Sequence, residues 1–194
     1  MKKHLPLLVF ILSIYNLSAQ NLIVNGDFES GGNGVGFITD GAGYSELLAP
    51  FSGTTVSGNF ALATNPISVN SSIFINAGDH TTGSGKMLIV DGNTTAGSPR
   101  FWKAGNAGSG ICGLTIGTSY TFSYWVKSIS TTVTNASTQA GIGISFTGAG
   151  SIVPTPFSSV VPLPASGWKQ VVYTFKATAT CVSIELWNNN VNAT

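Results

Sequence analysis

Charged side chains are scarce in this chain: they make up 8% of the residues and are nearly balanced in sign. Apart from the two lysines at the start, six basic residues stand against seven acidic ones. Binding to nucleic acid requires clustered Lys and Arg that neutralise phosphates, so we expect no nucleic-acid partner. The abundance of Gly, Ser, Thr and Asn predicts a neutral surface rich in hydroxyl and amide groups. Exported β-proteins that meet sugars have such surfaces, and so do exported β-proteins that bind nothing in particular.

Catalytic groups are also scarce. Beyond the first twenty residues there is one histidine, His80, which is too few for a catalytic zinc site. Its setting, Asp79-His80-Thr81-Thr82-Gly83, is typical of a turn in which Asp79 accepts backbone N–H bonds. A glycosidase needs two carboxylates that face each other, but Glu185 alone lies inside one of the well-alternating strands, and the other acidic residues fall at strand ends or in loops. We therefore expect that the protein is not an enzyme.

Long apolar runs are missing too, apart from a short one at the start. Lys2, Lys3 and His4 precede the apolar stretch 5–17, and the small residue Ala19 follows it. This pattern is that of a secretory signal peptide and is too short for a membrane span. We predict a signal peptide over 1–20 and one exported domain over 21–194, secreted or on a bacterial cell surface, with no transmembrane segment.

The chain has two cysteines, Cys112 and Cys181. In an exported protein an even number of cysteines predicts a disulfide, and both residues lie at predicted strand starts. Two buried free thiols are the alternative.

Period-two alternation of apolar and polar residues is the main structural signal. It predicts strands that each bury one face, and Gly, Asn, Ser and Pro clusters separate them. The fold class is therefore all-β, an antiparallel β-sandwich of the jelly-roll type. The well-alternating strands are 120–127, 141–146, 170–176 and 181–187, and the shorter candidates are 22–24, 60–63, 67–75, 86–91 and 101–103.

The polar run 188–194 ends the sequence where a jelly roll normally has a strand that pairs back near its beginning. Without that strand a sheet edge stays open. We expect that the closing strand is missing and that further domains of a longer parent chain follow.

Three segments resemble known modules. Asn25-Gly26-Asp27-Phe28-Glu29 resembles the opening of galactose-binding-like jelly-roll carbohydrate-binding modules, and the segment 167–175, GWKQVVYTF, is similar to their late strand. The segment 79–88, with Asp79-His80-Thr81, is similar to the Asp-His-Thr segment of meprin-type (MAM) adhesion domains. The combination resembles modules of type IX-secreted bacterial surface proteins. It implies a carbohydrate ligand or another extracellular surface ligand.

Calcium is the cofactor that the resemblance implies. In such modules a structural calcium lies between the opening Glu and the closing strand, and this sequence stops before that strand. Glu29 matches the opening half. Asp27 and Glu29 alternate around Phe28, so on an extended strand both carboxylates point one way and offer the oxygen ligands that calcium takes. The alternative is that Asp27 caps the Asn25-Gly26 turn and Glu29 is solvated.

Sugar binding needs exposed aromatic rings beside polar groups. Trp187 and Glu185 lie opposite the apolar face of their strand, and Trp125 lies opposite that of strand 120–127. Gly141, Gly143 and Ser145 leave the non-core side of their strand unfilled, which predicts a shallow groove with Trp125 and Trp187 as platforms and Glu185 as acceptor.

Trp102, beside Arg100 and Lys103, is a further ligand candidate. The alternative is that the long segments 31–58 and 147–166 cover these rings. The sequence thus predicts a non-catalytic binding module, and the second hypothesis is a structural or adhesive spacer that binds no sugar.

Overall fold

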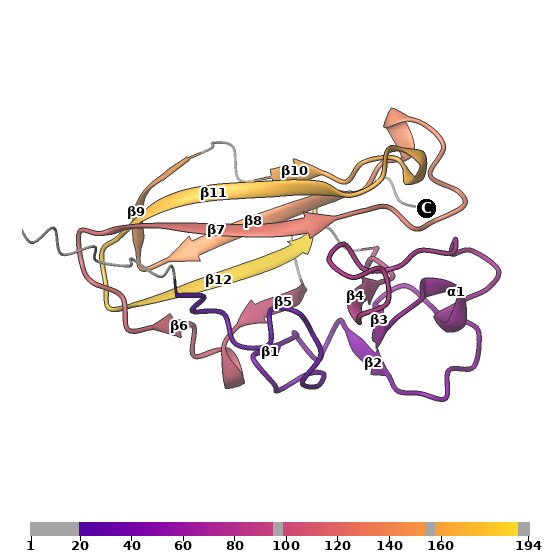
Figure 1. Cartoon of the computed structure of the whole chain (residues 1–194), viewed down its shortest axis with the longest axis horizontal. Coiled ribbons are helices and arrows are strands. Elements are labelled where there is room, and N and C mark those ends of the chain that lie inside the picture. The colour runs from indigo at the N-terminus through magenta and orange to yellow at the C-terminus, as the bar shows by residue number, and fades with distance from the viewer. Residues whose placement is uncertain (1–19, 95–98, 154–157, 190–194) are drawn as a thin grey trace, which may run out of the picture.

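The computed structural model describes residues 20–94, 99–153 and 158–189 (Figure 1). The predicted signal peptide up to residue 19 and the end of the polar run, 190–194, lie outside the described residues. Within these ranges no helix combines the length and the apolar character needed to cross a membrane. The strands are β1 (Phe37–Ile38), β2 (Ser45–Leu47), β3 (Asn59–Ala63), β4 (Met87–Val90), β5 (Arg100–Ala104), β6 (Ile111–Cys112), β7 (Ser119–Val126), β8 (Gly141–Thr147), β9 (Ala149–Val153), β10 (Ser158–Val160), β11 (Lys169–Ala177) and β12 (Cys181–Asn188). The helical elements are α1 (Pro66–Val69) and the short 3-10 helices η1 (Asn106–Gly108), η2 (Ala136–Thr138) and η3 (Pro164–Ser166).

Two antiparallel sheets form a β-sandwich, which confirms the predicted fold class. The larger sheet has the order β1-β5-β12-β8-β10, with β6 paired to one end of β12, and the smaller sheet has the order β7-β11-β9. Aromatic side chains from both sheets meet between them: Trp102 contacts Phe122, and Phe146 contacts Tyr173. This contact layer is the main core.

Strict alternation explains why these strands share that core. In β12, Val182, Ile184 and Leu186 are buried, while the residues between them are partly exposed. In β11 the burial pattern also alternates, and Tyr173 is completely buried. Each strand therefore contributes one apolar face to the interior. The predicted strands 120–127, 141–146, 170–176 and 181–187 are confirmed by β7, β8, β11 and β12.

A third, smaller sheet of β2, β3 and β4 lies beside the sandwich (Figure 1). Strand β3 pairs in parallel with β2 and antiparallel with β4. Its two faces bury different residues: Phe60 belongs to the main core, whereas Ala61 and Ala63 belong to a second core that includes Val69 of α1 and Phe74. Because both faces are covered, this sheet joins the α1 region to the sandwich.

Two of the shorter predicted strands are wrong. The region 67–75 contains the end of α1, since Asn65 accepts a hydrogen bond from the Ile67 amide and Pro66 stands in the first turn, both of which favour a helix start. The region 22–24 leads into a turn instead of a strand, and Asn25 and Phe28 have positive φ values of 54° and 63°. The short strands near 60–63, 86–91 and 101–103 are present as β3, β4 and β5.

The predicted disulfide is confirmed. Cys112 of β6 and Cys181 of β12 are register partners in neighbouring strands, and their sulfur atoms are bonded. The bond ties β6 to the start of the strand that occupies the centre of the larger sheet.

Candidate functional site

The outer face of the larger sheet carries two of the four residues that the sequence predicts for a ligand site, Glu185 and Trp187. Because Ile184 and Leu186 of β12 point into the core, Glu185 and Trp187 point away from it. Strand β8 lies next to β12, with Glu185 opposite Ser145 and Trp187 opposite Gly143. We call this surface the Trp187 face; its residues are Arg100, Lys103, Gly141, Gly143, Ser145, Ser158, Val160, Glu185, Trp187 and Asn189.

The indole of Trp187 lies against the backbone of Gly143. A Cβ atom at Gly143 would stand 2.3 Å from Nε1 and Cε2 of the indole, so only glycine leaves room for the ring. The guanidinium carbon of Arg100 lies over the same ring, 4.5 Å from its centroid. Since the sheet lies beneath the ring at Gly143, the guanidinium covers its outward side in a cation–π contact.

Two ion pairs lie beside this ring. Arg100 Nε donates to Glu185 at 3.1 Å, and Lys103 Nζ donates to Asp40 at 3.2 Å, with each of the four side chains about a quarter to a third exposed. Asp40 also accepts a hydrogen bond from the Arg100 amide at 2.9 Å. A register shift between Leu186 and Trp187 in the pairing of β12 with β5 allows Arg100 and Lys103 to share one face although they are three residues apart.

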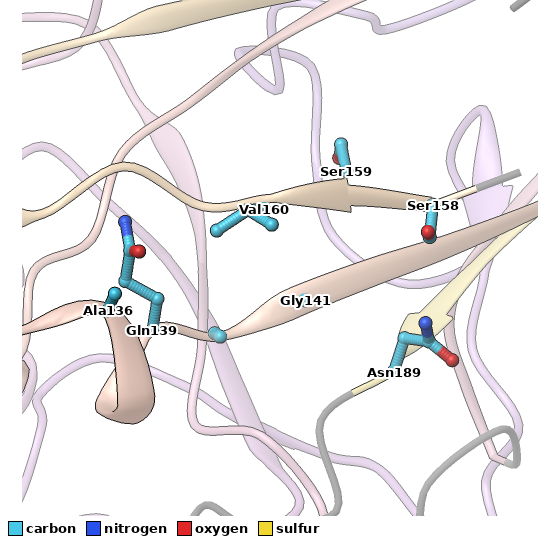
Figure 2. Close-up of a pocket in the computed structure, with 8 residues that line it drawn as sticks. Ala136, Gln139, Gly141, Ser158, Ser159, Val160 and Asn189 are labelled. Atoms are coloured by element: carbon cyan, nitrogen blue, oxygen red, sulfur yellow. The ribbon is translucent and has the colours of Figure 1, made fainter. Parts of the chain in front are cut away.

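A shallow hollow of about 220 Å³ lies at the end of this face, next to β10 (Figure 2). The side chains of Ser158 and Val160 point to one side of β10 and that of Ser159 to the other (Figure 2), where its hydroxyl lies 2.9 Å from the Tyr124 hydroxyl. Gln139, which donates to the Val161 carbonyl, stands at the rim. The lining residues are Ala136, Gln139, Ala140, Gly141, Ser158, Ser159, Val160 and Asn189.

The hollow and the Trp187 ring are adjacent on the sheet. Val160 pairs with Gly141 at the hollow, and Ser158 pairs with Gly143 beneath the ring. Two residues along a strand span about 7 Å. A chain-like ligand along β8 would therefore meet the ring and the hollow in succession.

Trp125 lies on the other sheet. It belongs to β7, whose neighbours Tyr124 and Val126 pack toward the main core, so its ring points outward from the smaller sheet. Trp125 and Trp187 consequently stand on the two opposite outer faces of the sandwich, and the predicted groove shared by both rings is wrong. The indole of Trp125 is 42% exposed and stacks on the imidazole of His80, with ring centroids 3.5 Å apart.

The prediction that Trp102 is a surface ligand contact is wrong, because Trp102 lies in the interior. Its side chain is 6% exposed and packs against Phe122 across the sandwich. The reason is its register position, because it stands opposite Leu186, which also points into the core. We leave Trp102 out of the candidate site.

Asp27 and Glu29 do not lie on an extended strand, contrary to the expectation behind the calcium prediction. Asp27 accepts a hydrogen bond from the Glu29 amide, and Glu29 Oε1 accepts the Lys86 amide at 2.5 Å. In the part of the chain that the structure describes, no three His, Cys, Asp or Glu side chains gather as metal ligands do. Asp27 and Glu29 are thus not arranged as a preformed calcium site. Calcium binding stays a prediction that rests on the resemblance.

The loop 79–86, which precedes β4, is built around Asp79. Its carboxylate accepts hydrogen bonds from the amides of Thr81, Thr82 and Gly85 and from the Thr82 hydroxyl. These hydrogen bonds hold the pKa of Asp79 well below its ordinary value, and the bonds from Thr82 have the largest effect. The expected turn is confirmed, and it presents His80 to Trp125.

Sequence reasoning missed the partners of the ligand candidates. The unfilled side of Gly143 is visible in the sequence, but its occupation by Trp187 is not. The pairing of Lys103 with Asp40 joins β5 to the loop after β1, and no alternation pattern reveals such a contact. For the stacking of His80 on Trp125 the sequence holds no signal, because the two residues are 45 positions apart and the contact follows from the fold.

Comparisons with protein-family models, with curated proteins and with solved structures found no match to this chain.

Proposed function

We propose that the protein is a non-catalytic, exported binding module that takes carbohydrate on its Trp187 face. One observation carries the proposal: the indole of Trp187 lies against the backbone of Gly143, between a polar hollow and an Arg–Glu pair. Sugars are recognised by aromatic rings that cover their apolar faces and by planar polar side chains that hydrogen-bond their hydroxyls.

The polar groups needed for such recognition stand at the edge of the ring. Glu185 offers carboxylate oxygens as acceptors and Arg100 offers N–H donors. Ser145 and Ser158 add hydroxyls on the neighbouring strands, and Asn189 adds an amide at the hollow. A ligand that stacks on Trp187 would displace the guanidinium from the ring and hydrogen-bond it instead.

Export is part of the proposal. The disulfide between Cys112 and Cys181 supports it, because such bonds persist in oxidising compartments. The signal-peptide pattern over 1–20 supports it from the sequence.

A panel of soluble polysaccharides in affinity gel electrophoresis tests the proposal, with Trp187→Ala as the variant and Trp125→Ala as the matched control. Both changes remove one outward indole, but from opposite faces of the sandwich. We expect at least one polysaccharide to retard the wild type, and Trp187→Ala to weaken this binding by about 10-fold or more while Trp125→Ala keeps it. Equal loss in both variants, or retention in both, would place any binding elsewhere.

The second candidate is a structural or adhesive spacer, and a specific observation favours it. Both outward indoles already have a partner on one face, Arg100 over Trp187 and His80 on Trp125. For a spacer we expect no polysaccharide to retard the wild type, and Trp187→Ala to lower only the free energy of unfolding.

A further inference from the structure

The charges of the Trp187 face cancel. The strands of the larger sheet contain three charged side chains within the described residues, Arg100, Lys103 and Glu185. Arg100 is paired with Glu185, and Lys103 is paired with Asp40 from the loop after β1. Each cation thus has a carboxylate about 3 Å away, and the face together with Asp40 has no net charge.

The hollow beside the ring is also uncharged. Its lining offers the hydroxyl of Ser158 and the amides of Gln139 and Asn189 next to Ala, Gly and Val. Hydroxyl and amide groups both donate and accept hydrogen bonds, which matches the hydroxyl groups of a sugar. An anionic group placed here would meet no unopposed cation, and near the ring it would compete with Glu185 and Asp40.

We infer that the Trp187 face selects uncharged glycan chains and rejects carboxylated or sulfated ones. The inference rests on the proposed function, and it adds the class of glycan. A neutral chain along β8 would place one sugar on the Trp187 ring and a neighbouring one over the hollow, about 7 Å away. Binding would desolvate the charges of a polyanion at a cost in free energy, and no net Coulomb attraction would offset that cost.

Polygalacturonate and fully methyl-esterified polygalacturonate form a matched pair of probes, because they share one backbone and differ in charge. We test them with neutral glucomannan, galactan and arabinoxylan and with alginate and heparin, at about 20 mM and about 500 mM NaCl. We expect binding among the neutral probes, with less than about two-fold change between the two salt concentrations, and no binding to the anionic probes. Binding to an anionic probe that salt abolishes would overturn the inference but leave the proposed function standing. Binding to no probe would defeat the proposed function itself.

Glu185→Gln gives a second test. The amide has the size of the carboxylate and still accepts a hydrogen bond from Arg100, but the face gains one net positive charge. We expect polygalacturonate to retard this variant at about 20 mM NaCl, where it does not retard the wild type, and the retardation to be lost at about 500 mM. An unchanged response to polygalacturonate would show that charge balance does not exclude anionic glycans and would overturn the inference.

Discussion

The imidazole of His80 lies flat on the indole of Trp125, with ring centroids 3.5 Å apart and ring planes 13° from parallel. The same imidazole meets Trp168 edge-on at 6.3 Å. Lys86, at the other end of the His80 loop, donates its amide to Glu29. The loop 79–86 thus joins the first described turn of the chain to the smaller sheet. The three sequence segments that carry the resemblance meet at this point.

Replacing His80 by Ala removes the stack but leaves the hydrogen bonds of Asp79 within the loop and the attachment of Lys86 to Glu29. We expect the free energy of unfolding to fall by about 1 kcal/mol, the usual contribution of an aromatic pair. Urea unfolding followed by circular dichroism measures this change. His80→Phe is the matched control, since it keeps a planar ring against Trp125 and should retain most of the stability. An equal loss in both variants would mean that the stack itself contributes nothing.

Asp79 should make stability depend on acid. Hydrogen bonds to Thr82, Gly85 and Thr81 lower the pKa of its carboxyl in the folded state below the ordinary value of about 3.9. A lowered folded pKa stabilises the protein above the unfolded pKa, and this contribution is lost as the pH falls from about 5 through 3.9 toward the folded pKa.

Asp79→Asn should therefore lower the urea midpoint at pH 7, and the gap from the wild type should narrow below about pH 4. Urea titrations at several pH values between about 7 and 3 measure the gap. Asp27→Asn, at an acid that bonds one amide, is the control. A gap that stays constant down to about pH 3 would contradict the lowered pKa.

The strands that bury one face could be predicted because their alternation depends on the two-residue period of the backbone. Strands 120–127 and 181–187 are examples, and both are present as β7 and β12. The strand predicted at 67–75 failed for a local reason, because Asn65 and Pro66 start a helix there. Two strands of the third sheet, β3 and β4, are predicted, but its position between two cores is not, since β3 buries Phe60 and Ala61 in different cores and no alternation results.

For the candidate site, the sequence was informative about faces within a strand and silent about which strands are neighbours. Glu185 and Trp187 were placed together correctly because they are two residues apart on one strand. The predicted groove also includes Trp125, whose strand belongs to the other sheet. Trp102 is buried because it pairs with the inward-pointing Leu186, and register is a property of two strands rather than one.

Removing the disulfide should cost stability without changing the fold. Cys112 and Cys181 are 69 positions apart, and a cross-link of that length removes unfolded-state freedom worth roughly 4 kcal/mol. We expect the double variant Cys112→Ala/Cys181→Ala to show that loss in urea unfolding and to keep its β-type circular dichroism. Dithiothreitol should weaken the wild type and leave the double variant unaffected. A wild type that dithiothreitol leaves unchanged would contradict the prediction.

The resemblance predicts that calcium stabilises the protein through Glu29. A ligand that binds only the folded state raises the melting temperature, so calcium added to chelator-treated wild type should raise it, and Glu29→Gln should abolish the rise. Calorimetric titration and thermal unfolding measure the two effects. Asp79→Asn is the control for loss of a nearby carboxylate. A titration without heat and without a change in melting temperature would show that the prediction of calcium binding is wrong.

Two core tyrosines should respond in opposite ways to loss of their hydroxyl. The Tyr173 hydroxyl is buried and makes no hydrogen bond of ordinary length, whereas the Tyr124 hydroxyl bonds Ser159 at 2.9 Å. An unpaired buried hydroxyl carries its desolvation cost without compensation, so Tyr173→Phe should leave the free energy of unfolding unchanged or raise it by up to about 1 kcal/mol. Tyr124→Phe leaves the Ser159 hydroxyl without this hydrogen-bond partner, and it should lower the free energy of unfolding by about 1 kcal/mol. The two substitutions remove the same atom, so urea unfolding compares them directly. A larger loss at Tyr173 would mean that its hydroxyl has a partner in solution, with a buried water as the first candidate.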